Sequence, residues 1–217
     1  MSKKEKRIKK RNPRGSKFFR VFRVLFAWLV GLIFRIKVVN KQNEPDEGGY
    51  IVCANHISAT DPIMLCYAFR KHQVCFMAKK ELFKHKLPAA FFRSLGAYPI
   101  DRSGANVSAV KGTVRMLQEG HCTAMFPQGT RHSGVHPSGT PIKSGVGLIA
   151  ARAKVPVLPV MIRNDKWKIG IFRRTEIIIG EPIHPEELLP QGDGEHVNYS
   201  EVSRLIFDRI CALEEKR

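Results

Sequence analysis

The chain has 217 residues, 43% of them hydrophobic, which suits one globular domain with a buried core better than two small ones. Its formal net charge is +18 at pH 7, and residues 1–37 supply +12 of it through thirteen Lys and Arg against one acid. Five scattered cysteines without a CxxC pair exclude a zinc-binding spacing and indicate buried, reduced thiols in a cytosolic compartment.

The N-terminal segment predicts an amphipathic helix at a membrane interface. Residues 1–17 are charged and nearly free of large apolar side chains, so we expect a disordered basic tail. In residues 18–36, Phe, Leu and Ile recur at helical spacing, with Arg20 and Arg23 off that stripe. The uncharged run over 24–34 is shorter than the about 20 residues that a spanning helix needs, and no signal-peptide cleavage site follows. A helix packed on its own domain is the alternative.

After residue 37, apolar runs typical of strands alternate with helical patterns. This alternation predicts an α/β fold, a mixed and largely buried β-sheet flanked by helices, over residues 37–217. The pattern over 80–96 reads as one or two short helices broken near Pro88. We expect strands near residues 36–40, 50–54, 74–78, 97–100, 121–126, 155–162 and 175–183, and helices near 62–72, 80–96, 105–120, 146–154 and 197–217.

The segment ANHISATDP places a histidine and an aspartate five positions apart, directly after a predicted strand. Asp61 could accept a bond from one ring nitrogen of His56, which sets the tautomer and leaves the other nitrogen to take a proton from a hydroxyl. Asp61 could instead be an ordinary N-cap before Pro62, with His56 in a plain loop. Ser58 is not flanked by the glycines of a nucleophile elbow, so the attacking hydroxyl is expected to come from a substrate.

Two arginines follow predicted strands in turn-like segments. Arg131 lies in FPQGTRHSG and Arg102 in GAYPIDRSG. A guanidinium keeps its charge and presents a flat fork to phosphate, so the two side chains together could hold one phosphate dianion. The alternative is that each is a solvated or salt-bridged loop residue.

In their order along the chain, four blocks resemble the glycerolipid acyltransferase family: NHISATD, GAYPIDR, FPQGTR and VPVLPV. The resemblance covers roughly residues 38–182. It implies that His56 is the general base and that Asp61 orients it. It further implies that the acceptor's phosphate is received by Arg102 and Arg131, with Gly129 and Thr130 nearby, and that Lys79 and Lys143 occupy substrate-binding positions.

The third block departs from the family at one position, because Gln128 stands where a glutamate is common. An amide can still donate and accept hydrogen bonds but cannot carry charge. We therefore expect Gln128 to support an arginine or the backbone turn, and a proton-transfer role at this position is excluded.

The resemblance implies transfer of an acyl group from acyl-CoA or acyl carrier protein to 1-acyl-glycerol-3-phosphate (lysophosphatidic acid), which makes phosphatidic acid. No metal or cofactor is expected. The basic N-terminus then favours an anionic membrane surface as partner, at the cytoplasmic face, with peripheral or monotopic attachment and no nucleic acid. The alternatives are another acceptor such as glycerol phosphate or a lyso-aminolipid, a histidine-based hydrolase or metal site, and a basic nucleic-acid-binding protein.

Overall fold

The computed structural model describes residues 29–100, 107–189 and 197–214. Within these ranges seven strands form one sheet, in the order β1-β7-β6-β2-β5-β3-β4. Strands β6, β2, β5, β3 and β4 are parallel, whereas β7 pairs antiparallel with β6 and β1 pairs parallel with β7. The strands are β1 (Ile36–Val39), β2 (Ile51–Ala54), β3 (Val74–Lys79), β4 (Ala97–Ile100), β5 (Cys122–Met125), β6 (Val157–Arg163) and β7 (Thr175–Ile179).

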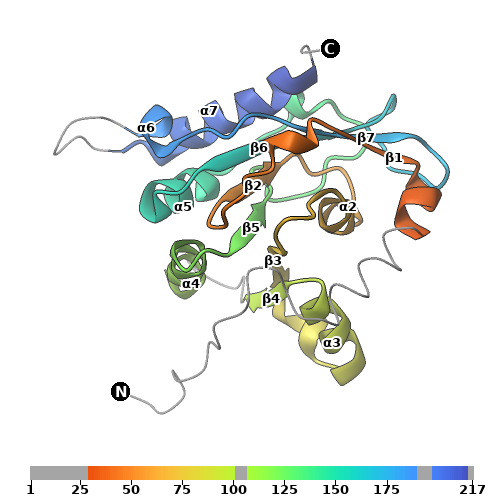
Figure 1. Cartoon of the computed structure of the whole chain (residues 1–217), viewed down its shortest axis with the longest axis horizontal. Coiled ribbons are helices and arrows are strands. Elements are labelled where there is room, and N and C mark those ends of the chain that lie inside the picture. Colours follow the sequence, from red (N-terminus) through yellow and green to blue (C-terminus); the bar gives the residue numbers. More distant parts are fainter. Residues whose placement is uncertain (1–28, 101–106, 190–196, 215–217) are drawn as a thin grey trace.

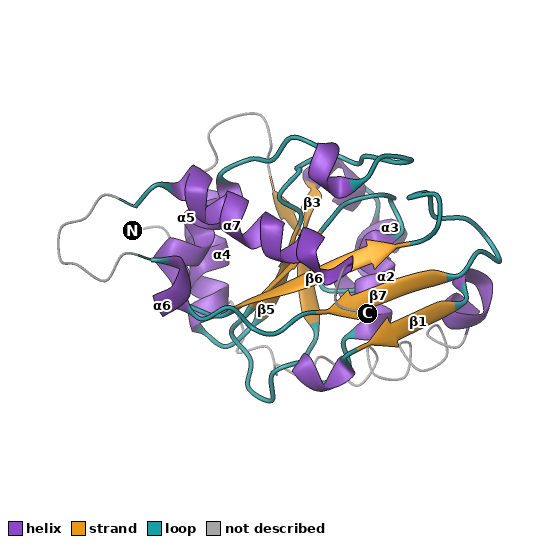
Figure 2. Ribbon diagram, turned by 90° about the horizontal axis from the view of Figure 1, so that it is seen from above, coloured by secondary structure: helices purple, strands orange, loops and turns teal. Residues whose placement is uncertain are grey.

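Helices cover both faces of this sheet (Figure 1). Figure 2 shows α4, α5, α6 and α7 together on one face, with α2 on the other. The described helices are α2 (Asp61–Ala68), α3 (Lys86–Ser94), α4 (Val107–Gln118), α5 (Gly145–Ala153), α6 (Pro185–Leu188) and α7 (Tyr199–Cys211), with 3₁₀ turns η1 (Lys41–Asn43), η2 (Lys80–Phe83), η3 (Pro137–Gly139) and η4 (Ala212–Glu214).

Strand β2 explains how one sheet supports two cores. Val52 and Ala54 pack with the α2 side chains, while Ile51 and Cys53 pack with α5 and α7. Successive side chains of a strand point to opposite faces, so a continuous apolar run buries both faces at once. The predicted mixed, largely buried sheet flanked by helices is confirmed.

The candidate site residues lie at one edge of the sheet. The carboxyl ends of the five parallel strands meet there, and His56 follows β2 while Pro127 follows β5. Because β1 and β7 run in the opposite direction, they begin at this same edge. In open α/β sheets ligands bind outside the carboxyl ends of the strands, so this edge is where a site is expected.

Two local predictions differ from the structure. The break in 80–96 falls between η2 and α3 rather than at Pro88, which is the third residue of α3. The first N–H groups of a helix have no intrahelical partner, so proline costs no hydrogen bond there. Helix α6 was not predicted, because it is a single turn begun by Pro185.

The predicted basic tail over 1–17 and most of the predicted helix over 18–36 lie outside the described residues. Residues 29–34 are helical, and β1 begins at Ile36. Among the helices in the described ranges, none combines the length and the apolar character needed to cross a bilayer.

Candidate active site

His56 and Asp61 are joined by a hydrogen bond at the end of β2. The distance from His56 Nδ1 to Asp61 Oδ2 is 2.7 Å, and the side chains are 17% and 0% exposed. Asp61 Oδ2 also accepts the backbone N–H groups of Ile57 at 2.7 Å and Ser58 at 2.8 Å. All three bonds go to Oδ2 and offset part of the cost of burying the carboxylate, while Oδ1 is buried with no hydrogen-bond partner among the described residues. When the imidazole is neutral, it donates Nδ1–H to Asp61 and leaves Nε2 as the acceptor.

The N-cap interpretation of Asp61 does not describe this turn. Helix α2 begins at Asp61 itself, Thr60 is the N-cap residue, and no side-chain cap bond is made. Instead the Asp61 carboxylate reaches back toward His56 across residues 57 and 58. The spacing of five positions therefore serves to close a ring between the histidine and the carboxylate.

The backbone of His56 is held as firmly as its ring. Its N–H donates to Gln128 Oε1 at 2.6 Å, and its carbonyl accepts the N–H of His132 at 2.8 Å. Gln128 is 3% exposed and donates through Nε2 to Thr140 Oγ1 at 2.7 Å. These two bonds reach a backbone amide and a hydroxyl rather than the imidazole, which matches the expected supporting role of this amide.

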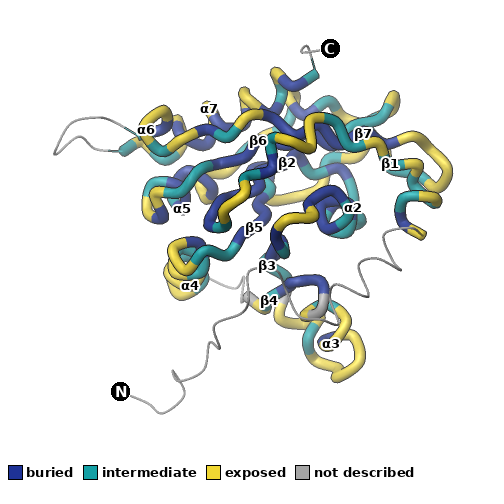
Figure 3. The backbone as a smooth tube through the Cα atoms, viewed as in Figure 1, coloured by how far each residue is buried: buried dark blue, intermediate teal, exposed yellow. Residues whose placement is uncertain are grey.

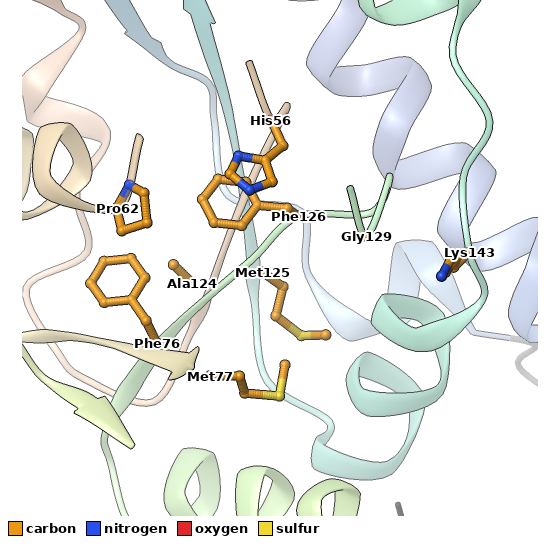
Figure 4. Close-up of a pocket in the computed structure, with 9 residues that line it drawn as sticks. All are labelled: His56, Pro62, Phe76, Met77, Ala124, Met125, Phe126, Gly129 and Lys143. Atoms are coloured by element: carbon orange, nitrogen blue, oxygen red, sulfur yellow. The ribbon is translucent and has the colours of Figure 1, made fainter. Parts of the chain in front are cut away.

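The His56 ring lies against a pocket of about 350 Å³. It stacks on Phe126 with 4.1 Å between ring centroids and 17° between the planes. Figure 4 shows the stacked pair, with Gly129 and Lys143 on one side and Pro62 on the other. The remaining lining is apolar and comes from β3 and β5: Phe76, Met77, Ala124 and Met125.

Two of the expected substrate-binding residues reach this pocket. Gly129 has φ +69, and a Cβ built there would lie 3.0 Å from Lys143 Cδ. The Lys143 backbone N–H donates to the Pro127 carbonyl at 2.8 Å, which holds the lysine segment beside the turn. Glycine thus allows both the left-handed turn and the close approach of the Lys143 stem.

Thr130 and Arg131 lie on the same loop and are exposed. Thr130 Oγ1 is 3.2 Å from His132 Nε2. Arg102 lies outside the described residues, two positions after the end of β4. Lys79 is the last residue of β3, and its side chain is not described. His56 and Asp61 are therefore brought together with Gly129 and Lys143, and Arg131 lies two residues after Gly129 in the segment between β5 and α5.

The apolar lining was missed by the sequence analysis, as was the stacked Phe126. Phe126 could have been found, since it opens the same block as Gln128. Phe76 and Met77 could not, because they reach the pocket only through the pairing of β3 with β5. Within the described ranges, His, Cys, Asp and Glu side chains form no group of three or more that could hold a metal ion.

This fold and this site define an α/β protein with a carboxylate-oriented imidazole beside an apolar pocket. The family model for Acyltransferase matches residues 35–163, and the chain belongs to that family. The predicted family and the predicted enzyme class, an acyltransferase, are confirmed.

The curated relatives agree with this assignment. The chain is 32% identical to a Bacillus subtilis 1-acyl-sn-glycerol-3-phosphate acyltransferase, over 83% of this chain and 89% of that protein. It is 32% identical to the Streptococcus pneumoniae protein of the same name, over 78% of this chain and 63% of that one. The crystal structure of the 1-acyl-sn-glycerophosphate (LPA) acyltransferase PlsC from Thermotoga maritima has a similar fold, with a TM-score of 0.62 and 23% identity over 93% of this chain and 80% of that one.

Proposed function

We propose that this acyltransferase acylates the free hydroxyl of 1-acyl-glycerol-3-phosphate and so makes phosphatidic acid. The observation that carries the proposal is the 2.7 Å bond between His56 and Asp61, with the ring bordering a pocket. The names of the relatives supply the acceptor, since both bacterial proteins are called 1-acyl-sn-glycerol-3-phosphate acyltransferases.

In the proposed reaction His56 Nε2 is the general base. The acceptor oxygen bonds to the thioester carbonyl carbon while its proton passes to Nε2. The carbon–sulfur bond then breaks, and the imidazolium returns the proton to the departing thiolate. Asp61 stabilises the imidazolium, and proton transfer of this kind contributes on the order of 10²- to 10⁴-fold in rate. The donor is an acyl thioester, acyl-CoA or acyl carrier protein, and no metal or cofactor takes part.

The phosphate of the acceptor is assigned to Arg131 and Arg102, with Gly129 and Thr130 shaping the turn. Arg131 is exposed on the loop that carries Gln128, and β4 ends two residues before Arg102 at the same edge of the sheet. Lys143, beside Gly129, adds a positive charge at the pocket. Lys79 is assigned to substrate binding from its position at the end of β3.

Residues 37–217 are proposed as the acyltransferase domain, and residues 1–36 as its attachment to the membrane. The amphipathic pattern over 18–36 and the basic tail over 1–17 favour an anionic bilayer surface over nucleic acid. We place the enzyme at the cytoplasmic face as a peripheral or monotopic protein. Loss of all vesicle binding in high salt would favour a purely ionic partner such as nucleic acid instead.

Replacement of His56 tests the mechanism. We expect His56→Ala to lower kcat by at least about 10²-fold, because the general base is lost. Asp61→Asn should also lower kcat, with a smaller change in acceptor KM. His85→Ala is the control, since His85 is exposed and its side chain caps nothing. Kinetics are measured on folded protein, checked by circular dichroism; His56→Ala with more than about a tenth of the parent rate would contradict the assignment.

The acceptor is tested by supplying lysophosphatidic acid, glycerol phosphate or a lyso-aminolipid with labelled acyl-CoA or acyl carrier protein. We expect lysophosphatidic acid to be preferred, with phosphatidic acid as the product. Arg131→Ala should raise KM for that acceptor more than KM for the thioester, and equal increases would contradict the phosphate assignment. Activity lost to a chelator, or release of free fatty acid alone, would favour the metal-site or hydrolase alternative.

A further inference from the structure

The loop between β6 and β7 presents large apolar side chains to solvent. Residues 164–174 read NDKWKIGIFRR, and Ile171 and Phe172 are 66% and 67% exposed. Figure 3 shows this connection as a largely exposed loop that projects beside the helical turn before β1. Exposed apolar side chains on a projecting loop are a feature of surfaces that contact proteins or membranes.

The base of this loop is ordered by specific contacts. The Asn164 Oδ1 atom accepts the N–H groups of Lys166 at 3.1 Å and Lys168 at 2.9 Å. Trp167 and Ile169 are partly buried against the sheet core. The loop therefore uses Trp167 and Ile169 for packing and leaves Ile171 and Phe172 outside, although all four side chains are apolar. Phe172 also has φ +61, a costly conformation for a bulky residue.

The loop tip lies against the helical segment 29–34. The Phe172 N–H donates to the Ile33 carbonyl at 2.7 Å, so the two backbones are in direct contact. Leu29 and Leu32 on that segment are 43% and 57% exposed. The exposed apolar group thus comes from two parts of the chain; we call Leu29, Leu32, Ile171 and Phe172 the apolar tip.

Loop 164–174, which carries half of the apolar tip, is rich in positive charge. Lys166, Lys168 and Arg173 are exposed, and in the described part of the chain they form no ion pair. Arg174 is exposed too, although it pairs with Glu176 at 3.3 Å. Against these four cations the loop has one acid, Asp165. Exposed apolar side chains on a loop rich in basic residues match the acyl region and the anionic headgroups of a bilayer interface.

The apolar tip lies at the same edge of the sheet as the active site. The loop follows the carboxyl end of β6, which is the parallel neighbour of β2 with His56 at its end. The Trp167 carbonyl accepts the N–H of Gly134 at 2.8 Å, which ties the loop to the segment that carries Gln128 and Arg131. A surface seated on the loop would therefore lie at the sheet edge that carries His56.

We propose that loop 164–174 is a second membrane-docking element, which inserts Ile171 and Phe172 among the headgroups of an anionic bilayer beside the active site. The inference deepens the proposed function, since it names the surface from which the lipid acceptor enters. Four apolar side chains on a projecting tip are few for a stable protein interface, which needs about 800 Å² on each partner. The four basic residues of the loop further favour lipid over an apolar protein surface.

Insertion is measured directly with a tryptophan at the tip. The full chain carrying Phe172→Trp is mixed with vesicles of phosphatidylglycerol and brominated phosphatidylcholine, and the emission gained over the parent is followed. We expect the added emission to be quenched. The control is Leu205→Trp, which places a tryptophan outside loop 164–174. Leu205 is 38% exposed and lies on α7, on the sheet face that α2 does not cover. Equal quenching at both positions, or none at 172, would overturn the proposal.

A kinetic test separates docking from chemistry. The double variant Ile171→Ser/Phe172→Ser should lose about tenfold in kcat/KM for long-chain lysophosphatidic acid presented in vesicles. Its rate with a short-chain, water-soluble acceptor should match the parent. Equal losses with both acceptors would mean that the loop only supports the fold and would overturn docking. An oligomeric state that differs between the parent and the double variant would assign the tip to a protein interface and would also overturn docking.

The proposed function and the docking proposal can fail separately. If the parent protein acylates no lysophosphatidic acid, the proposed acceptor is wrong while the quenching result still decides whether the tip inserts. If acylation occurs but the tip is not quenched, the docking proposal alone is wrong.

Discussion

At the scale of single residues, His56 is constrained from four directions. Asp61 holds the ring edge, Phe126 the ring face, Gln128 the backbone N–H, and His132 the carbonyl. An imidazole in the proposed role of general base must be placed within a fraction of an ångström for proton transfer, so we expect these contacts to bear on rate as well as on stability. The glutamine in place of the family's usual glutamate keeps one of these contacts without adding charge.

Two substitutions of Gln128 distinguish the effect of its hydrogen bond to the His56 N–H from the effect of a charge at this position. Gln128→Ala leaves the His56 N–H without its acceptor, so we expect the free energy of unfolding to fall by about 1–3 kcal/mol and kcat to fall with it. Gln128→Glu keeps an acceptor oxygen and should retain kcat within a few-fold. Urea unfolding and steady-state kinetics of both variants check this, and a fully active, fully stable Gln128→Ala would contradict it.

At the scale of elements, α5 and α7 pack closely enough to restrict one position to glycine. The Gly147 N–H donates to Ser203 Oγ at 2.9 Å, and a Cβ built on Gly147 would lie 2.1 Å from the Tyr199 carbonyl oxygen. A backbone atom cannot yield as a flexible side chain can. The position of α5 on the sheet, and with it the segment that brings Lys143 to the pocket, depends on this contact.

Replacement of two helical glycines by alanine should therefore have opposite effects. We expect Gly147→Ala to lower the free energy of unfolding by about 1–3 kcal/mol or more, because the helices must separate. Gly112→Ala on α4 should raise the free energy of unfolding by about 0.5–1 kcal/mol through helix propensity, because an added Cβ would meet no described atom outside the α4 backbone within 4 Å. Thermal or urea unfolding of both variants measures these changes. Equal changes in the free energy of unfolding would contradict the close contact between α5 and α7 at Gly147.

At the scale of the whole molecule, the sheet and its two helix layers bury nearly all the thiols. Four of the five free cysteines are buried, and Cys211 is partly buried. Burial raises the pKa of the Cys122 thiol to about 11, even though backbone hydrogen bonds from Gly49 and Tyr50 act in the opposite direction. The neutral thiol is thus favoured in the folded state.

This thiol makes a pH prediction with a definite sign. A raised folded-state pKa means that stability is full below the unfolded pKa of about 9 and falls as pH rises toward 11. We expect Cys122 to cost on the order of 1 kcal/mol of stability between about pH 7 and pH 10. Cys122→Ala should show a smaller decline over that range in urea unfolding. An identical decline in the parent and the variant would assign the effect to other groups.

The sequence by itself determined the local features. Apolar runs and helical periodicity predicted most of the strands and helices. The spacing in NHISATD allowed a histidine–aspartate pair as well as a plain N-cap, and the resemblance of the four blocks implied the pair, which can form across one turn without any distant contact. Only the tertiary structure decided that β7 runs against β6, that Phe76 and Met77 line the pocket, and that Gln128 holds the His56 backbone. These depend on contacts between residues far apart in the chain, which strand pairing and helix packing bring together and which no local pattern encodes.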